Sequence, residues 1–490
     1  ITCELVYENT IDSISKKIGF RESRLHEDEQ GAHFTLNDVP VAGKGVTVLP
    51  LAFTESNVKD EAYHKLIDDV LKANINMIRV NGAGRYLKDI FYDLCDEHGI
   101  LVWQDIMLAD FDYPIDSERF RTMISAELKY QVTRLRSHPS IVIWSGNAPA
   151  ELKDNPFYTD FLRDELSKYT NEQYVASTAG LELSSTASYP PMTMIETFTE
   201  FDDRYVGSYM MSTHLSQPSD DSLIYARIHE EFNAPYDFQQ YIYLSQLAQA
   251  KALKKQIEST RAKDRTQLMF TEQLNDFWPG ISRSSIDYFG NWKAAQYQLQ
   301  ASYNEYLIHI SEVENALNIN FINDEARAFE AMLKIQLKDF EGNVLKTAEK
   351  EVFVKELSNT TFTALNKNQW LKGENKAGVV LQIDLIETNG DLLSNKLHYF
   401  VKTKDLELTY PQMPYKVTKD DGFFVLELFT NTLVKDLRLR ADYDGFFEKN
   451  YFDLLPNDTL QIRFYNQYEL DAFDPNAMQF NSIEDSYIEE

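Results

Sequence analysis

Residues 73–106 have the sequence ANINMIRVNGAGRYLKDIFYDLCDEHGILVWQDI. A short apolar segment, Met77–Val80, is followed by a helical pattern over Arg85–His98 and by a second apolar segment, Ile100–Ile106. Gly99 directly follows the helical pattern, as is typical of a helix carboxyl terminus. Strand, helix and strand in this order predict a parallel βαβ unit.

The same alternation of apolar and helical segments continues from Gly45 to about Tyr303. Eight apolar segments can be counted, which is the number of strands in a (β/α)₈ barrel. They are Gly45–Pro50, Met77–Val80, Ile100–Ile106, Ile141–Gly146, Gln173–Thr178, Tyr205–Met210, Tyr225–Phe232 and Thr266–Asn275. We therefore predict a TIM barrel over residues 41–305.

Strand patterns without helices lie on both sides of this region. Residues 1–40 contain too few strands for a complete sandwich and are interpreted as the remnant of an immunoglobulin-like one. Residues 306–405 and 406–490 each predict a further β-sandwich. The predicted fold class is thus α/β plus all-β, a barrel flanked by immunoglobulin-like domains. Because the strands of residues 1–40 would leave unpaired edges, we expect an amino-terminal fragment or a second chain to complete them.

Composition excludes several function classes. The 490 residues include 48 Lys and Arg against 77 Asp and Glu, a net charge of −29. Nucleic acid is not expected as a partner, because phosphate binding requires a basic face. No apolar run approaches the roughly 20 residues that span a bilayer. Phosphate loops and zinc-ligand spacings are not evident, so neither a cofactor nor a metal site is predicted. The sequons at Asn359 and Asn457 favour a secreted or lysosomal glycoprotein.

A second run, residues 136–147, has the sequence RSHPSIVIWSGN and is followed by Ala148 and Pro149. It resembles the fourth-strand signature of the β-mannosidases of glycoside hydrolase family 2. In that family the run continues Asn-Glu, and the Glu is the general acid/base. Here Pro149 holds the place of the Glu and has no proton to donate. Further motifs that carry the resemblance are Lys17–Arg21, Ala73–Val80, Phe91–Ile100, Trp103–Asp105, Gln273–Trp278, Gly290–Lys293 and Gln479–Ser482. These 490 residues contain no counterpart of the family's amino-terminal jelly roll.

Retaining glycosidases need a second carboxyl group, the nucleophile, about 5 Å from the acid/base. The resemblance places it after the seventh strand and implies that Glu231 is the nucleophile equivalent. The alternative is that Glu231 is only a polar residue at a strand end. Whether Glu151 or Glu272 replaces the missing acid/base stays open, although catalytic placement tolerates errors of well under about 1 Å.

The remaining pocket positions differ from the family pattern as well. Arg79, Asp105, Trp144 and Asn147 are the candidates for lining a residual binding site, although packing or hydrogen bonding also explains them. At two places where the family has Trp the chain has smaller residues, which leaves room in the barrel mouth for a small molecule other than a sugar. We predict a β-mannosidase-like pseudoenzyme reused for binding, as a carrier or in a structural role. The alternative is an active retaining exo-β-mannosidase or other glycosidase with an altered acid/base or substrate.

Overall fold

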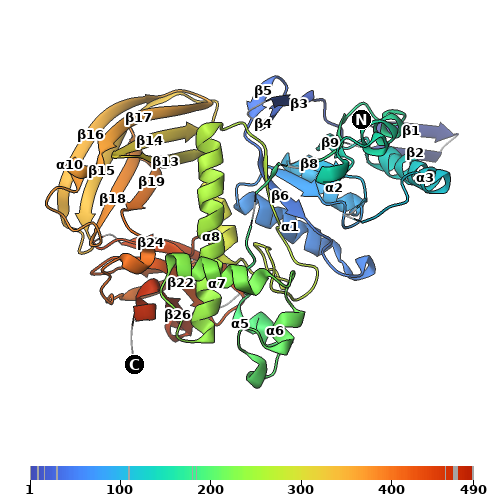
Figure 1. The fold of residues 1–490 in the computed structure, drawn as a ribbon. Coiled ribbons are helices and arrows are strands. Elements are labelled where there is room, and N and C mark those ends of the chain that lie inside the picture. Colours follow the sequence, from blue (N-terminus) through green and yellow to red (C-terminus); the bar gives the residue numbers. More distant parts are fainter. Residues whose placement is uncertain are drawn as a thin grey trace. The chain divides into compact units, whose positions relative to one another are not determined.

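The computed structural model divides into two compact units (Figure 1). The first comprises Ile1–Ser184 and Thr266–Trp278, and the second comprises Ser185–Arg265 and Pro279–Glu490. The residues that the structure describes are 2–7, 10–15, 17–28, 31–108, 111–178, 180–183, 185–457, 459–466 and 473–487.

The first unit is built on a parallel sheet with the strand order β10-β9-β8-β7-β6-β12-β11. In that order the strands are Gln173–Val175, Ile141–Ser145, Leu101–Asp105, Met77–Val80, Lys44–Val48, Met269–Thr271 and Glu182–Leu183. The four strands β6 to β9 are buried along their whole length, as expected for a sheet covered on both faces. Helices α1 (Asp60–Lys72), α2 (Asp89–His98) and α3 (Glu118–Leu135) follow β6, β7 and β8 in turn. Each therefore forms the crossover of a βαβ unit.

Two of the eight predicted strands are wrong. The segments Tyr205–Met210 and Tyr225–Phe232 contain the starts or bodies of helices α6 (Tyr209–Thr213) and α7 (Asp220–Glu231) instead. The buried apolar residues of α7 recur every fourth position, at Ile224 and Ile228, which is helical and not strand periodicity.

The short strand β11 lies where a seventh barrel strand would be expected. It pairs in parallel with β12, the strand that ends the barrel pattern in the sequence. In a closed barrel the neighbour of the eighth strand is the seventh, so β11 occupies the seventh position. Among the described residues no strand joins β10 to β11, and the barrel-type sheet is open between them.

The amino-terminal strands form two small antiparallel sheets. Strands β1 (Thr2–Tyr7) and β2 (Thr10–Ser15) make a hairpin. Strands β3 (Ser23–Asp28), β4 (Gly31–Leu36) and β5 (Val39–Val41) make a three-stranded sheet. Phe34 of β4 is fully buried in a core that it shares with Trp103 of β8 and Phe270 of β12. The three-stranded sheet therefore packs against the parallel sheet.

The second unit combines helices with two β-sandwiches. Helices α7, α8 (Phe238–Lys263) and α9 (Ala294–Ser302) share a core that includes Tyr189 and Leu244. In the first sandwich the sheet β13-β14-β17 faces the sheet β16-β15-β18-β19, and in the second β20-β21-β25-β23 faces β24-β22-β26. Their bounds are β13 Tyr306–Val313, β14 Ala316–Asn323, β15 Phe329–Asp339, β16 Val344–Val354, β17 Ser358–Asn366, β18 Val379–Glu387, β19 Leu392–Tyr399, β20 Tyr415–Asp420, β21 Phe423–Leu428, β22 Val434–Ala441, β23 Gly445–Phe447, β24 Phe452–Leu454, β25 Leu460–Asn466 and β26 Met478–Asn481.

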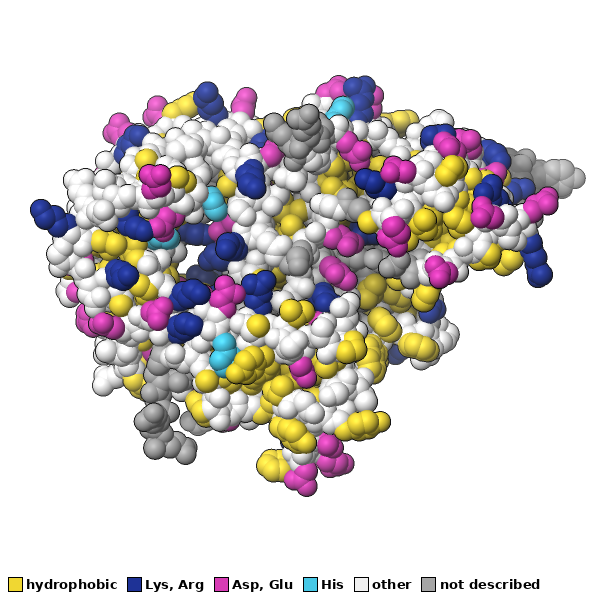
Figure 2. All heavy atoms as spheres, in the orientation of Figure 1, with side chains coloured by type: hydrophobic (Ala, Val, Ile, Leu, Met, Phe, Trp, Pro, Cys, Tyr) yellow, Lys and Arg dark blue, Asp and Glu magenta, His cyan; other side chains and the backbone are white. Residues whose placement is uncertain are grey.

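Surface charges of both signs are mixed. On the face drawn in Figure 2, Lys and Arg side chains lie interspersed with Asp and Glu side chains. Within the described part of the chain, no helix combines the length and apolar character needed to cross a bilayer.

Candidate functional site

Four polar side chains meet at the carboxyl edge of the parallel sheet and are here called the Arg79 cluster. Arg79 of β7 donates through Nε to Asp105 Oδ2 at the end of β8, at 2.9 Å. Its Nη2 donates to Asn147 Oδ1, which follows β9, also at 2.9 Å. Its Nη1 forms an ion pair with Glu182 of β11. Strands that are parallel end at the same edge, so residues distant in sequence converge there.

The backbone around the cluster is fitted to this arrangement. Asn147 has a φ of 52°, in the left-handed region that Asn tolerates better than most residues. Its Nδ2 donates to Leu108 O at 2.7 Å. Gly82 donates its N–H to Asp105 Oδ2, and a Cβ at this glycine would lie 2.6 Å from Ile106 O and 2.7 Å from Asn147 Nδ2. Glycine is therefore required at position 82 for this close approach.

The electrostatics of the cluster are dominated by burial. Arg79 and Asp105 are 1% and 0% exposed, whereas the side chain of Glu182 is 39% exposed. Burial raises the pKa of Asp105 above its usual value, although the charge and hydrogen bond of Arg79 oppose the shift. Asp105 Oδ1 is buried without a hydrogen-bond partner among the described residues. Arg79 thus lies between two carboxylates, one buried and one open to solvent.

The other residues predicted at or just after the fourth strand differ in their exposure to solvent. Trp144 of β9 is fully buried, which fits packing better than ligand contact. Ala148 is also buried, and its N–H donates to Ala176 O at 2.9 Å. Pro149 precedes the short helix η2 (Ala150–Leu152), on which Glu151 is exposed.

Glu231 lies in the second unit, at the end of α7. Its Oε1 accepts a hydrogen bond from Thr403 Oγ1 at 2.7 Å and lies 3.6 Å from Lys251 Nζ. Thr403 begins the short helix η5 (Thr403–Asp405), and its N–H also donates to Glu231 at 3.3 Å. The strand from which the nucleophile role of Glu231 was inferred is not formed, and the role itself stays a prediction.

Glu182 is the residue of the cluster that sequence reasoning missed. It stands 103 positions from Arg79 in the chain. Strand β11 contains only two residues, which is too short for any alternating pattern to be recognised. The detectable signal was the acidic residue itself, between the fifth predicted strand and the helices that follow.

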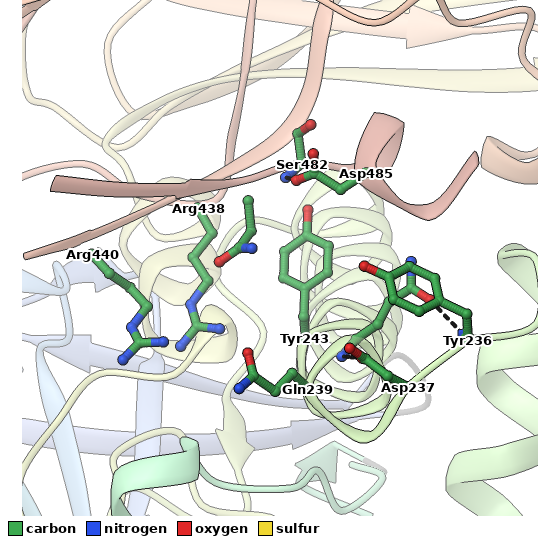
Figure 3. Close-up of a pocket in the computed structure, with 10 residues that line it drawn as sticks. Tyr236, Asp237, Gln239, Tyr243, Arg438, Arg440, Ser482 and Asp485 are labelled. Carbon is green, nitrogen blue, oxygen red and sulfur yellow. Dashed lines mark hydrogen bonds between the residues drawn. The ribbon is translucent and has the colours of Figure 1, made fainter. Parts of the chain in front are cut away.

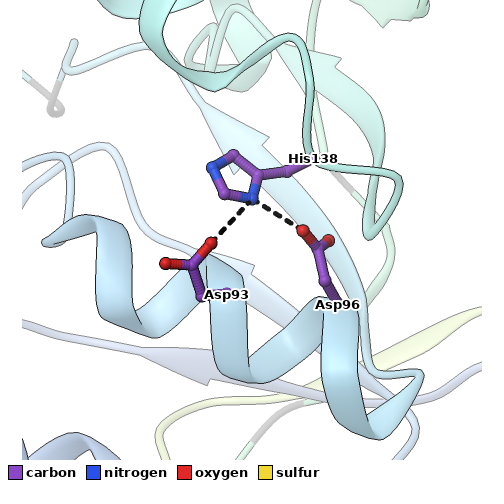
Figure 4. A group of neighbouring side chains, drawn as sticks. All are labelled: Asp93, Asp96 and His138. Carbon is purple, nitrogen blue, oxygen red and sulfur yellow. Dashed lines mark hydrogen bonds and ion pairs between the residues drawn. The ribbon is translucent and has the colours of Figure 1, made fainter. Parts of the chain in front are cut away.

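A second group of acidic and histidine side chains has a structural explanation. His138 Nδ1 lies 2.7 Å from Asp96 Oδ2 and 3.8 Å from Asp93 Oδ1 (Figure 4). Asp96 Oδ1 accepts the N–H of Ser140 at 2.9 Å. Burial opposes ionisation of Asp96, but the hydrogen bonds from His138 and Ser140 outweigh it and lower its pKa. The group ties α2 to the start of β9.

Comparison with known proteins gives matches along most of the chain. The family described as Mannosidase Ig/CBM-like domain matches residues 315–405, and an Ig-fold domain family matches residues 408–485. The β-mannosidase of Rattus norvegicus is 28% identical over 407 residues, which cover 66% of this chain and 46% of that protein. The β-mannosidase of Capra hircus is 25% identical, with 92% of this chain and 61% of that protein covered. The chain thus spans roughly half of the length of these relatives.

A solved structure extends the likeness to the fold. The β-D-mannosidase of Dictyoglomus thermophilum superposes with a TM-score of 0.87 at 25% identity, and the match covers 97% of this chain and 64% of that one. The predicted fold class, a barrel-type α/β domain with immunoglobulin-like sandwiches, is confirmed, with the barrel sheet in an open form. The chain is thus similar to β-mannosidases along most of its length, in sequence and in fold.

Proposed function

We propose that this chain is a β-mannosidase-like pseudoenzyme, whose barrel site no longer hydrolyses glycosides and serves binding or structure. The observation that carries the proposal is Pro149, a residue without a proton to donate, at the place where the family resemblance expects the general acid/base. A retaining mechanism needs one carboxyl group free to attack and another free to donate a proton across an open gap.

On the acid/base side, the position implied by the family resemblance holds a residue that has no proton to donate. Pro149 follows Ala148 where the family carries Asn-Glu, and the N–H of Ala148 is used by a backbone carbonyl. Glu151 is exposed on η2, and no hydrogen bond to another described residue fixes its carboxylate. Loss of general acid catalysis alone costs about 10²–10⁴ in rate.

On the nucleophile side two residues have to be considered. Glu182 occupies the seventh-strand position and is held by the guanidinium of Arg79, which fills the space toward Asp105. Glu231, the residue implied by the family resemblance, is engaged by Thr403 and Lys251 in its own unit. In both cases the carboxylate already has partners that stabilise the fold.

The proposal is tested with 2,4-dinitrophenyl β-D-mannoside, whose leaving group departs without protonation. The pure protein is incubated with this substrate near pH 5, with and without sodium azide. Glu182→Gln and Glu231→Gln are measured beside it. We expect no turnover above that of the two variants under either condition. Turnover that azide accelerates and that one of these substitutions abolishes would overturn the proposal and identify the nucleophile.

The alternative, an active retaining glycosidase, has one observation in its favour. Asp105 and Glu182 share a single guanidinium, and Glu182 is partly exposed. A ligand that displaced Arg79 would bring two carboxyl groups to one site. Azide-dependent turnover that is lost in Glu182→Gln, and not in Glu231→Gln, would support this alternative.

The localisation of the protein is likewise a proposal, as are its partners. Both sequon residues, Asn359 and Asn457, are exposed, which supports a secreted or lysosomal glycoprotein. To test this, the protein is expressed in secreting cells and treated with a glycosidase that removes N-linked glycans, and its electrophoretic mobility should then increase. The control is the double variant Asn359→Gln/Asn457→Gln, whose mobility should not change.

The expected partner is an amino-terminal fragment or second chain that pairs with the strands of residues 1–40. A small-molecule ligand in the barrel mouth is testable by native mass spectrometry.

A further inference from the structure

A cavity in the second unit is lined by two neighbouring arginines. It has a volume of about 70 Å³ and lies between the first turn of α8, strand β22 and the segment around β26. Arg438 and Arg440 of β22 lie side by side along one wall, with Gln239 below them and Tyr243 next to them (Figure 3).

The strand geometry explains why the two arginines are together. Residues two apart on a strand point to the same face, so Arg438 and Arg440 present both guanidinium groups to the cavity. In the ladder to β26 they stand opposite Asn481 and Gln479. Neither of these partners carries a charge that could neutralise an arginine.

The arginine pair lacks the carboxylates that other buried arginines of this protein have. Arg79 is paired with Asp105, and Arg261 with Asp324 at 2.6 Å. Arg438 is only 9% exposed, yet no carboxylate among the described residues pairs with its guanidinium, whose carbon lies 6.0 Å from the centroid of the Tyr451 ring. No ion pair or hydrogen bond of Arg440 is found there either. A charge removed from water without a partner is costly, which indicates that the site is completed by an anion.

The two aspartates that also line the cavity do not fill this role. Asp237 caps α8 and accepts the N–H of Gln240 at 2.7 Å, and Asp485 accepts the N–H of Ser482 at 2.7 Å. In Figure 3 Asp237 lies on the other side of Tyr243 from the arginines, and Asp485 lies beyond the hydroxyl end of this ring. The hydroxyl of Tyr243 donates to Asp436 O at 2.6 Å, so this ring is fixed between the two halves of the cavity.

Charges of both signs act on Arg440, and among the described residues none of the negative ones forms an ion pair with it. Burial lowers the pKa of Arg440 below its usual value, and the neighbouring charge of Arg438 adds to the shift. Asp442 and Glu196 oppose it, but Asp442 accepts a hydrogen bond from Gln479 and Glu196 pairs with Arg204.

We propose that Arg438 and Arg440 bind a small oxyanion, the phosphate or sulfate group of a free ion or of a monoester. Two adjacent guanidinium forks match the several oxygens and double charge of such a group. The cavity volume of about 70 Å³ equals that of roughly two liquid water molecules, which suits one tetrahedral anion. Gln239 is exposed at the same end and supplies an amide donor.

The test is equilibrium dialysis of the full chain against radiolabelled inorganic phosphate at constant ionic strength. We expect saturable uptake of one phosphate per chain. Arg440→Gln, a half-buried position, should weaken binding at least about tenfold, because a charge-assisted hydrogen bond contributes about 1.5–3 kcal/mol. Arg438→Lys keeps the charge but loses the fork and should weaken binding as well. The matched control is Arg463→Gln on the exposed face of β25, which should bind like the wild type.

Competition experiments separate the possible sources of the anion. Displacement of phosphate by glucose 6-phosphate would show that a monoester is accepted, and displacement by sulfate alone would restrict the ligand to the free ion; both support the proposal. Equal displacement by acetate would overturn the assigned class. Uptake that is the same in wild type and Arg440→Gln, or that does not saturate below about 10 mM, would overturn the site itself.

Discussion

Replacing Arg79 by methionine tests the interpretation of the Arg79 cluster as a structural element. The substitution keeps an apolar stem but removes the cation that lies between Asp105 and Glu182. Asp105 is 0% exposed, and of its described hydrogen-bond donors to Oδ2 the N–H of Gly82 would remain. An uncompensated buried charge costs about 3–5 kcal/mol. The pair with Glu182 adds about 0–1 kcal/mol, because that carboxylate is largely hydrated.

The expected loss for Arg79→Met is therefore about 4 kcal/mol near neutral pH, which corresponds to a fall of roughly 10 °C in the unfolding midpoint of a unit of this size. Burial already raises the pKa of Asp105, and removal of Arg79 raises it further. Protonation of Asp105 then relieves part of the cost, so the difference between variant and wild type should shrink as the pH falls toward about 5.

Thermal unfolding followed by circular dichroism at several pH values measures this difference. Glu182→Gln is the matched control and should cost less than about 1 kcal/mol. The double variant Arg79→Met/Asp105→Asn should recover most of the loss, since no buried charge remains. The reasoning is refuted if Arg79→Met is as stable as Glu182→Gln, or if Asp105→Asn gives no recovery.

Four further substitutions should change stability or activity in a direction that the structure predicts. Burial raises the pKa of Glu484 to about 7 from 4.5, so the stability contributed by the protonated side chain is fully present below about pH 4.5 and is lost as the pH rises through 7. Thermal unfolding should therefore show Glu484→Gln to be more stable than the wild type by about 3 kcal/mol above pH 8 and equally stable at pH 4. The pKa of Asp96 is lowered, so its carboxylate contributes stability above about pH 4 that is lost on acidification. In urea titrations Asp96→Asn should lower the free energy of unfolding by about 1–2 kcal/mol at pH 7, and the difference from the wild type should disappear in acid. Gly82→Ala should destabilise by about 1–3 kcal/mol in the same titrations, because its Cβ would lie 2.6 Å from a carbonyl oxygen. Pro149→Glu should not create mannosidase activity while Arg79 holds Glu182, and a gain above about tenfold on an aryl β-mannoside would contradict this.

The strands that could be predicted are those with strong local signals. The run from residue 73 to 106 contains a buried strand, a helix and a second buried strand, and Gly99 adopts the left-handed conformation expected after the helix. Three of the candidates named from the sequence, Arg79, Asp105 and Asn147, meet because the strands of a parallel sheet end at the same edge. These expectations needed only local patterns and a known sheet geometry.

The region between β10 and α8 could not be predicted in the same way. Here the count of eight strands was completed with segments whose period was helical, so α7 was taken for the seventh strand. The strand that fills this position has two residues, and its place is decided by pairing with β12, a long-range contact. The interpretation of Glu231 depended on the wrong strand, and Glu182 was missed for the same reason.

The open sheet and the missing acid/base have a common physical consequence. Catalysis requires carboxyl groups held within about 0.5 Å of a productive position, and a closed barrel supplies this by pairing every strand on both edges. Among the described residues, β11 pairs along one edge, with two residues of β12. Its further attachment is the ion pair between Glu182 and Arg79, which reaches across the sheet end. The carboxylate in the seventh-strand position thus anchors its own strand, which is the structural role that the proposed loss of catalysis assigns to it.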